Sequence, residues 1–355
     1  MSLTGPVEVV GVGLLGTSVA LACRRAGLEV LLTDVSPEHL RTASGLGAGR
    51  PRVDADLPQL VVVAVPPDHL GAAVTEALIR TDAVVTDVGS VKQAPLRAVL
   101  SAGEAVDAAR YVGSHPMAGS ERSGPLAASA ALFDGRPWAV VPHEGSRPDA
   151  IALVDELAAV CGAATVRLSP ADHDRAVART SHLPHLAAVL VAGRLADAPA
   201  DHLALSGQGL RDVTRVAGSD PGLWEQIVSA NDRAVLGVLG ELREQLDTLI
   251  AALDSGERPG LHDVLTRGVA GTRAIPGKHG GPVRPMGAVF VAVPDHPGEL
   301  ARLFADAGAS DVNIEDVHID HDPARPVGLV ELVVEEARAE HLLTSLESRG
   351  WVTHR

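Results

Sequence analysis

Aromatic residues and lysines are the residues that this chain of 355 has least of. Phe, Trp and Tyr make up 2% of the sequence, so a buried core must be built from Ala, Val and Leu. So few rings cannot supply the stacking surfaces on which single-stranded nucleic acids bind. Of the 30 basic residues only Lys92 and Lys278 are lysines, and the rest are arginines. These shortages predict an aliphatic core and argue against a nucleic-acid-binding protein.

Positive charge is also scarce, because the formal net charge is −15. Nucleic acids and anionic membranes attract clustered basic residues, so we expect neither as a partner. No apolar run approaches the ~18 residues of a membrane-spanning helix, and Met1–Val10 lacks the basic segment of a signal peptide. Cys23 and Cys161 have neither metal-site nor redox spacing, so we expect buried thiols in a reducing cytoplasm.

Short valine-rich segments alternate with helical patterns over the first half of the chain. Because these apolar runs are continuous, we expect a parallel sheet covered on both faces by helices. The expected strands are Val7–Val10, Val30–Thr33, Leu60–Val65, Ala83–Asp87, Trp138–Val141 and Thr165–Leu168. The expected helices are Leu15–Ala26, Asp68–Ile79 and Asp149–Val160. The pattern predicts an α/β Rossmann-type dinucleotide-binding domain over residues 1–169.

Helical periodicity replaces the strand signals over residues 170–254. Leu183–Leu195 and Leu223–Leu253 are expected as long helices, the second without a proline. We expect an all-helical domain that contributes to the substrate site and to a homodimer interface. Residues 255–286 are rich in Gly and Pro and are predicted to form a linker, in which Leu261–Val269 could be a short helix.

Strand signals return in residues 287–355. The expected elements are strand Ala288–Val293, helix Gly298–Ala307, strands Val312–Ile319 and Val327–Val334, helix Ala337–Arg349 and strand Trp351–Thr353. This βαββαβ order predicts a separate ferredoxin-like module.

A GxGxxG pattern follows the first expected strand and opens the first expected helix. In such a turn the glycines allow a tight bend and close approach of the backbone to a pyrophosphate, which the helix N-terminus binds. Asp34 ends the next strand, where its carboxylate would bind ribose hydroxyls and repel a 2′-phosphate, so NAD is favoured over NADP. A ligand-free turn, and Asp34 as a mere helix cap, are the alternatives. The residues predicted to bind the cofactor are Gly11, Gly13, Leu14, Leu15, Gly16, Asp34, Val65 and Lys92.

His115 is the candidate general base. It lies in the segment Gly113–Glu121 (GSHPMAGSE), which we place in a loop after a parallel strand, where α/β sheets bind ligands. A neutral imidazole can take the proton of an alcohol whose carbon loses hydride, and its ionisation is expected in the neutral range. A packed loop histidine is the alternative.

Two further pairs of polar residues fit an anionic substrate. His182 and His185 are three residues apart and share one helical face, and without a third ligand nearby a hydrogen-bonding role is favoured over a metal site. Arg211 and Arg215 can each bind a carboxylate with a guanidinium fork. A salt bridge with Asp212 is the alternative for Arg211.

Together these motifs resemble those of prephenate dehydrogenases, which have them in the same order. The resemblance covers most of residues 7–254, and GSHPMAGSE is its most specific part. It implies NAD-dependent oxidative decarboxylation of prephenate to 4-hydroxyphenylpyruvate in tyrosine biosynthesis. Some relatives prefer arogenate and some use NADP, so arogenate dehydrogenase is the alternative. More distant alternatives are a non-catalytic sensor of NAD and an amino acid, and another reductase of similar architecture.

The same resemblance implies roles for individual residues. His115 matches the catalytic base, and Ser90 matches a serine that bonds the substrate hydroxyl and that histidine. The implied substrate contacts are the gating acid Glu121, Ser181, His185 and the carboxylate-binding Arg215. Leu210 stands where many members have Phe, which could alter how the pocket packs.

Residues 287–355 resemble an ACT domain, a module that binds amino acids at a dimer interface. The residues implied to contact an effector are Asp295, Gly298, Glu299, Leu300, Asn313 and Ile314. The implied effector is tyrosine, the end product, and a purely structural module is the alternative.

Overall fold

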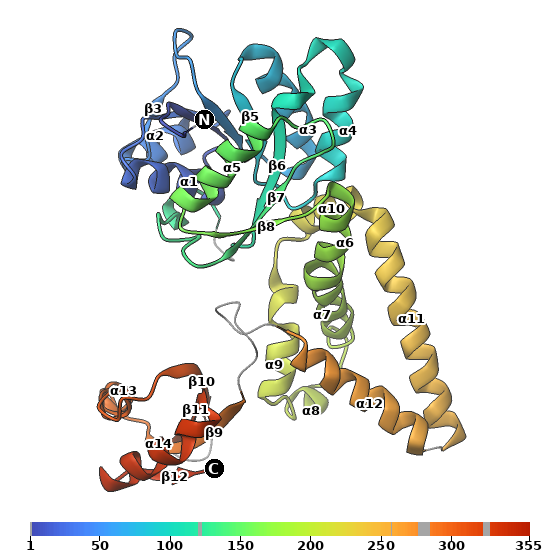
Figure 1. Ribbon diagram of the computed structural model, residues 1–355. Coiled ribbons are helices and arrows are strands. Elements are labelled where there is room, and N and C mark those ends of the chain that lie inside the picture. The colour runs from blue at the N-terminus through green and yellow to red at the C-terminus, as the bar shows by residue number, and fades with distance from the viewer. Residues whose placement is uncertain (1, 120–122, 257, 276–284, 322–326) are drawn as a thin grey trace. The chain divides into compact units, whose positions relative to one another are not determined.

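The computed structural model of this chain describes residues 2–119, 123–256, 258–275, 285–321 and 327–355 (Figure 1). It divides into two compact units, Met1–Asp247 and Thr248–Arg355, which we describe one at a time. Within the described residues, no helix combines the length and the hydropathy that crossing a membrane requires.

The first unit is built on an eight-stranded sheet with the order β3-β2-β1-β4-β5-β6-β7-β8 (Figure 1). Every neighbouring pair is parallel except β6 and β7. The strands are β1 Val7–Val10, β2 Val30–Thr33, β3 Arg50–Pro51, β4 Leu60–Val63, β5 Val84–Asp87, β6 Tyr111–Pro116, β7 Pro137–Val141 and β8 Ala164–Arg167. All residues of β4 and β5 are buried, because helices cover both faces. The predicted Rossmann-type α/β sheet is confirmed.

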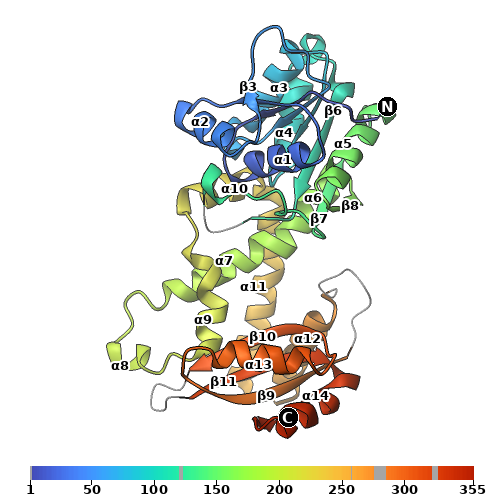
Figure 2. The same ribbon diagram turned by 90° about the vertical axis from the view of Figure 1, so that its left-hand side faces the viewer.

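Helices lie on both sides of the sheet (Figure 2). Two clusters of buried apolar side chains, one on each face, hold them to it. Helices α1 and α5 pack on one face against residues such as Val9 and Val62. Helices α3 and α4 pack on the other face against Val61, Val63 and Val85. The helices are α1 Leu14–Arg25, α2 Pro37–Gly45, α3 Pro67–Arg80, α4 Gln93–Ser101 and α5 Pro148–Val160. The core is mostly aliphatic, as the composition predicts, but it also contains Tyr111, Phe133 and Trp138, and Cys23 and Cys161 are buried thiols without a disulfide within it.

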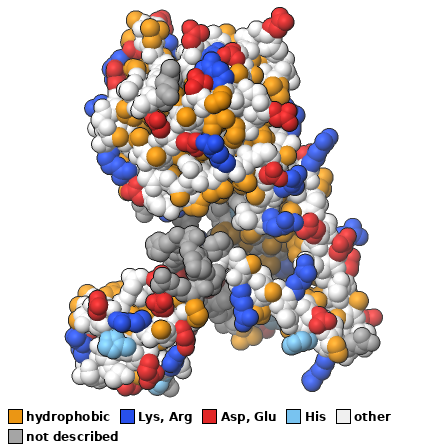
Figure 3. Space-filling view, viewed as in Figure 1, with side chains coloured by type: hydrophobic (Ala, Val, Ile, Leu, Met, Phe, Trp, Pro, Cys, Tyr) orange, Lys and Arg blue, Asp and Glu red, His pale blue; other side chains and the backbone are white. Residues whose placement is uncertain are grey.

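The surface of this α/β domain carries both signs of charge. On the face drawn in Figure 3, acidic and basic side chains alternate over the domain at the top and do not form separate fields.

One element that the sequence did not predict carries the candidate base. We expected His115 in a loop, but it lies in β6, opposite Ala139 of the antiparallel strand β7. The placement in a loop was therefore wrong, and so was the expectation of a wholly parallel sheet. The segment Tyr-Val-Gly-Ser-His-Pro has no continuous apolar run, so its sequence does not indicate a strand. It is buried because it lies between two neighbouring strands, β5 and β7.

Helices make up the rest of the first unit. They are α6 Pro170–Val177, a π-helical turn Ala178–His182, α7 Leu183–Gly193, α8 Ala200–Leu203, α9 Gln208–Thr214, a 3-10 turn Arg215–Gly218, α10 Pro221–Ala230 and α11 Asp232–Ser255. The single long helix predicted over Leu223–Leu253 is wrong, because it breaks at Asn231. Asn231 has φ −119° and ψ 27° and is 4% exposed. Its backbone departs from helical geometry here, and its side chain makes buried hydrogen bonds to the site described below.

The second unit contains a helix where a linker was expected. Helix α12 spans Arg258–Arg273 and is longer than the short helix considered from the sequence, whereas Lys278 lies outside the described residues. A four-stranded antiparallel sheet follows, with the order β10-β11-β9-β12. Its elements are β9 Met286–Pro294, α13 Glu299–Gly308, β10 Ile314–His321, β11 Val327–Glu335, α14 Glu336–Ser348 and β12 Val352–His354. Their order along the chain is the predicted one.

Candidate active site

The glycine-rich turn between β1 and α1 has the shape of a phosphate cradle. Gly11 has φ +91°, and a Cβ added to it would lie 2.6 Å from the carbonyl oxygen of Ala64. A Cβ on Gly16 would lie 1.9 Å from the carbonyl oxygen of Gly11, so α1 can pack this close to the turn only with glycine there. A Cβ on Gly13 would meet nothing within 4 Å, which leaves open space over the turn. These residues fit a dinucleotide whose pyrophosphate binds the N-terminus of α1.

Asp34 holds its carboxylate beside this turn. Its Oδ2 accepts a hydrogen bond from the backbone N–H of Val12 at 2.7 Å, and its Oδ1 accepts one from Ser36 at 2.7 Å. The cap of α2 is Ser36, whose Oγ accepts from the N–H of His39, so Asp34 is not the helix cap considered as an alternative. The carboxylate is thus placed where ribose hydroxyls could bind. Three apolar side chains around the turn are partly exposed, namely Leu14, Leu15 and Val65.

His115 lies near the end of β6 and is bonded to a second histidine. Its Nδ1 is 3.0 Å from Nε2 of His173, and the two rings meet edge to face with centroids 5.2 Å apart. His173, in α6, in turn places its Nδ1 2.9 Å from Oδ1 of Asp174. His115 is partly exposed, whereas His173 and Asp174 are each 1% exposed. Burial, followed by the nearby charges of His173, Lys92 and His182, lowers the pKa of His115 well below its ordinary value. The imidazole is therefore neutral at neutral pH, as a base must be.

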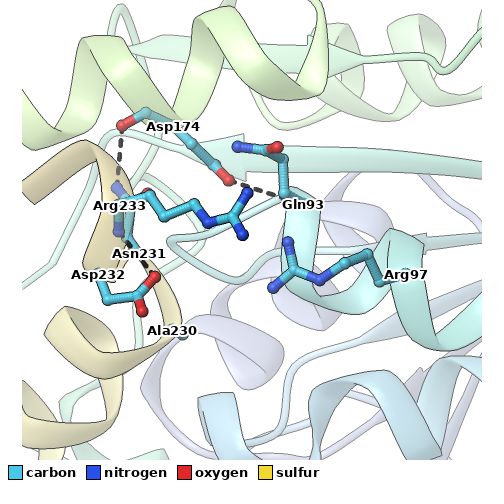
Figure 4. A pocket seen from close by; sticks show the side chains of 7 residues that line it. All are labelled: Gln93, Arg97, Asp174, Ala230, Asn231, Asp232 and Arg233. Atoms are coloured by element: carbon cyan, nitrogen blue, oxygen red, sulfur yellow. Dashed lines mark hydrogen bonds between the residues drawn. The ribbon is translucent and has the colours of Figure 1, made fainter.

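Asp174 joins three parts of the fold at this point. Its Oδ1 and Oδ2 accept hydrogen bonds from the backbone N–H groups of Lys92 and Gln93 at 2.8 and 2.9 Å, at the start of α4. Its carbonyl oxygen accepts from Nδ2 of Asn231 at 2.9 Å, at the break before α11 (Figure 4). Although burial opposes it, hydrogen bonds from His173 and these two N–H groups lower the pKa of Asp174. Asp174 is therefore an ionised carboxylate without freedom to rotate.

Lys92 is a buried ion-pair partner of Asp87, although the sequence suggested that it contacts the cofactor. Its Nζ bonds the Asp87 carboxylate and donates to the Ser114 carbonyl oxygen at 2.7 Å. Tyr111 donates its hydroxyl to the other Asp87 oxygen at 2.7 Å. Lys92 is 1% exposed, and burial lowers its pKa against the opposing charge of Asp87. The ammonium group of Lys92 thus contacts the backbone of Ser114, the residue before His115. Cofactor binding by Lys92 stays a prediction.

His182 and His185 meet on one aromatic side chain. His185 stacks on Trp224 of α10 with ring centroids 3.5 Å apart and an interplanar angle of 2°, and His182 contacts the same ring edge-on. Nδ1 of His182 is 3.3 Å from Nδ2 of Asn231. Burial lowers the pKa of His182 to about 4 and also lowers that of His185. Nδ1 of His185 is buried and has no hydrogen-bond partner in the described part of the chain, which is uncommon for a buried polar atom.

The two candidate arginines are exposed and lie on elements that pack against α7. Arg211 is in α9, and Arg215 begins the 3-10 turn that follows. Among the described residues Asp212 accepts a hydrogen bond from Gln208 at 2.8 Å, and no salt bridge between Arg211 and Asp212 is observed there. The backbone of both arginines therefore lies on elements that pack against the helix that carries His185, and their role in binding a carboxylate stays a prediction.

Two of the predicted contacts, Ser90 and Ser181, are not hydrogen-bonded to His115 among the described residues. Ser90 is partly exposed after β5, and no hydrogen bond between described residues links it to His115. Ser181 is exposed in the π-helical turn. Glu121 lies outside the described residues. Among the residues that are described, no group of three or more His, Cys, Asp or Glu is arranged to hold a metal ion.

Four residues that build this site were not predicted from the sequence: His173, Asp174, Trp224 and Asn231. A signal for the first two was present, since a His-Asp dipeptide follows the Ser169-Pro170 start of α6 and both side chains are buried. Nothing local marks Asn231, whose role depends on a helix that is distant in sequence.

Comparison with known proteins agrees with this geometry. Residues 19–167 match the family model of the prephenate dehydrogenase nucleotide-binding domain, and residues 169–267 match that of the prephenate dehydrogenase dimerization domain. The chain is 37% identical to the protein called probable prephenate dehydrogenase NovF of Streptomyces niveus, over 97% of this chain and 98% of that protein.

Two solved structures share the fold of most of the chain. One is prephenate dehydrogenase from Aquifex aeolicus in complex with hydroxyphenyl propionate and NAD+, which has 26% identity and a TM-score of 0.69 and covers 76% of this chain and 98% of that one. The other is arogenate dehydrogenase from Synechocystis, with 27% identity, a TM-score of 0.65 and coverage of 77% and 99%. With matched models over more than half of its length and a relative at 37% identity, this chain belongs to the prephenate dehydrogenase family.

Proposed function

We propose that this protein is an NAD-dependent prephenate dehydrogenase that converts prephenate to 4-hydroxyphenylpyruvate and carbon dioxide. The observation that carries the proposal is the position of His115 relative to the glycine turn. Because β1, β4, β5 and β6 are parallel, their carboxyl ends share one edge of the sheet, and that edge bears both the cradle and the base. The relative from Aquifex aeolicus binds NAD+ and a hydroxyphenyl compound in the same fold.

The bound nicotinamide supplies a hydride acceptor. The chain's residues do the rest of the work. His115 takes the proton of the ring hydroxyl as that carbon loses hydride, and loss of the ring carboxylate as carbon dioxide restores the aromatic ring. The three glycines make room for the pyrophosphate, and Asp34 receives the ribose hydroxyls. Arg211 and Arg215 hold substrate carboxylates, and His185 donates or accepts a hydrogen bond through its unpaired Nδ1.

Arogenate dehydrogenase is the second candidate, and the match to the Synechocystis arogenate dehydrogenase favours keeping it. Arogenate differs from prephenate by an amino group in place of the side-chain keto group. The base, the hydride transfer and the decarboxylation are the same for both substrates.

One assay tests these activities. The protein is mixed with NAD and prephenate, with NAD and arogenate, and with NADP and each substrate, and absorbance of the reduced nicotinamide is followed. We expect turnover with NAD and prephenate. No turnover with any combination contradicts the proposal, and turnover with arogenate alone selects the second candidate.

We further propose that residues 287–355 form an ACT module that binds tyrosine. The βαββαβ order and the antiparallel sheet order β10-β11-β9-β12 support this proposal. Gly298 has φ +95° just before α13, and the first residues of that helix, Glu299 and Leu300, follow a turn that begins at Asp295. Asn313 is exposed and precedes Ile314 at the start of β10. Tyrosine titration with and without Asn313→Ala tests the idea, and inhibition that is equal in both contradicts the assigned residues.

We propose a homodimer that forms through the helical domain. Large apolar side chains are exposed on α7 and α11, among them Leu190, Leu236 and Leu253, and the matched family model over residues 169–267 is that of a dimerization domain. Sedimentation of the full chain tests the dimer.

The domain boundaries 1–169, 170–254, 255–286 and 287–355 that the sequence suggests stay proposals. A cytoplasmic location is also a proposal, and the two buried thiols without a disulfide favour it.

A further inference from the structure

We propose that His173 and Asp174 are positioning residues that fix the tautomer of His115. This inference rests on the proposed function, in which His115 is the base. The three side chains form one chain of hydrogen bonds, 3.0 Å from His115 Nδ1 to His173 Nε2 and 2.9 Å from His173 Nδ1 to Asp174 Oδ1. Both distances are those of ordinary hydrogen bonds, so each link must have one donor and one acceptor.

The direction of this chain is set at Asp174. An ionised carboxylate can only accept, and Asp174 already accepts from the N–H groups of Lys92 and Gln93. His173 must therefore donate through Nδ1. In a neutral ring the other nitrogen then carries a lone pair, so Nε2 of His173 accepts the proton of His115 Nδ1. The lone pair of His115 is left on Nε2.

Burial makes the opposite direction costly. His173 and Asp174 are each 1% exposed, so water does not replace a hydrogen bond lost between them. Reversing the chain requires either a protonated Asp174 or a cationic His173. The first is opposed because three hydrogen bonds lower the pKa of the Asp174 carboxyl although burial opposes them. The second would bury a charged imidazole that is 1% exposed, with only the Asp174 carboxylate to offset its loss of hydration.

The fold holds this series of hydrogen bonds rigidly between two domains. His115 belongs to the sheet, whereas His173 and Asp174 belong to α6, the first helix of the helical domain. Backbone N–H groups at the start of α4 donate hydrogen bonds to the Asp174 carboxylate, and the Asn231 side chain donates one to the Asp174 backbone carbonyl (Figure 4). His115 consequently has the correct tautomer only when α6 is docked on the sheet.

The chemical consequence concerns one proton. When the substrate hydroxyl ionises, its O–H bond breaks and an Nε2–H bond forms on His115, with no change in the oxidation state of the imidazole. The resulting imidazolium still donates through Nδ1 to His173, and the negative charge of Asp174 lies beyond. The opposite tautomer would present an N–H to the hydroxyl proton and could not accept it. Loss of the carboxylate that orients a catalytic histidine lowers kcat by about 10⁴ in Ser-His-Asp triads.

The tautomer can be observed directly. In protein labelled with ¹⁵N-histidine, long-range ¹H–¹⁵N correlation spectra distinguish Nδ1–H from Nε2–H rings, and His115→Asn assigns the His115 signals. We expect the Nδ1–H tautomer for His115 in the wild-type protein. An Nε2–H tautomer, or a cationic His173, overturns the proposal whether or not the protein turns over prephenate. If turnover is absent with every substrate while the tautomer is as expected, only the proposed function fails.

A pair of variants tests the consequence for catalysis. His173→Gln keeps an oxygen that can accept from His115 Nδ1–H, whereas His173→Leu has a similar size and no acceptor. We expect His173→Leu to lower kcat by about 10- to 1,000-fold, part of the usual contribution of a general base, with little change in the affinity for NAD. The kcat of His173→Gln should be at least about tenfold higher than that of His173→Leu. Equal kcat values for the two variants overturn the proposal.

A matched control uses a histidine of the α/β domain that takes no part in the hydrogen bonds between His115, His173 and Asp174. His143→Gln removes a ring whose nitrogens bond the Ala108 carbonyl and the N–H of Gly145, and it should leave kcat and the His115 signals unchanged. If His173→Leu does not fold, the spectra of the wild-type protein and His173→Gln decide, since a flipped His115 tautomer in either contradicts the assigned direction.

Discussion

Replacing Lys92 by methionine should destabilise the α/β domain by about 3–5 kcal/mol, because it leaves a buried carboxylate without its cation. Lys92 is 1% exposed and Asp87 is fully buried. Methionine occupies a similar length but removes the ion pair to Asp87 and the 2.7 Å hydrogen bond to the Ser114 carbonyl oxygen. The Tyr111 hydroxyl and the Gly89 N–H would remain as the donors to Asp87. Since domains are stable by about 5–15 kcal/mol, the loss is about a fifth of the total at the least, and it could equal the whole stability of a marginal domain.

A double-mutant cycle separates this mechanism from a simple packing defect. Asp87→Asn should also cost several kcal/mol, because it leaves a buried ammonium group. The double variant buries neither charge, so its cost should be at least about 2 kcal/mol below the sum of the two single costs. If the pair were only a packing contact, the two costs would add.

The measurement can be confined to the domain in question. The chain has three tryptophans, of which Trp138 is fully buried beside the sheet, so Trp224→Phe and Trp351→Phe leave a fluorescence signal from the α/β domain. Urea unfolding in that background gives the four free energies. A cost below about 1 kcal/mol for Lys92→Met, or additive single costs, refutes the reasoning.

Four further outcomes are expected. His115→Asn should lower kcat by roughly two to four orders of magnitude while fluorescence titration shows unchanged NAD binding; near-normal turnover contradicts the base assignment. Arg215→Ala should raise KM for the anionic substrate about 10- to 100-fold, and an unchanged KM removes it from the site. Because the pKa of His115 is held well below 6.5, kcat/KM should be flat from about pH 6.5 to 8.5 and fall only in more acidic solution, unlike the neutral-range ionisation expected from sequence; a limb centred above pH 6.5 opposes this. Because the pKa of His182 falls from 6.5 to about 4 on folding, the unfolded chain binds the extra proton, so stability should drop by about 2–3 kcal/mol between pH 6.5 and 4, and His182→Asn should reduce that drop in acid unfolding curves.

The elements that could be predicted are those whose own residues encode them. The glycine turn after Val7–Val10 combines a buried apolar strand with a spacing that only a tight turn needs, and it lies where expected. Six of the eight strands of the first unit and the order of elements in residues 287–355 were predicted for the same reason, whereas the two-residue strand β3 was not predicted. Strand β6 was missed because its burial is conferred by β5 and β7, and the helix break at Asn231 was missed because no proline or glycine marks it.

By itself, the sequence determined the α/β alternation, the dinucleotide turn, the candidate base His115 and the family to which these motifs point. The tertiary structure decided what surrounds that base. His173 and His115 are 58 positions apart in the chain, and their contact exists because α6 packs at the end of β6. The tertiary structure also makes Lys92, a lysine in a chain of arginines, the buried partner of Asp87, with β6 supplying the Ser114 carbonyl and the Tyr111 hydroxyl beside the pair. Periodicity reflects local backbone preferences, whereas the partner of a buried polar group depends on which distant donor or acceptor the fold brings within hydrogen-bonding distance.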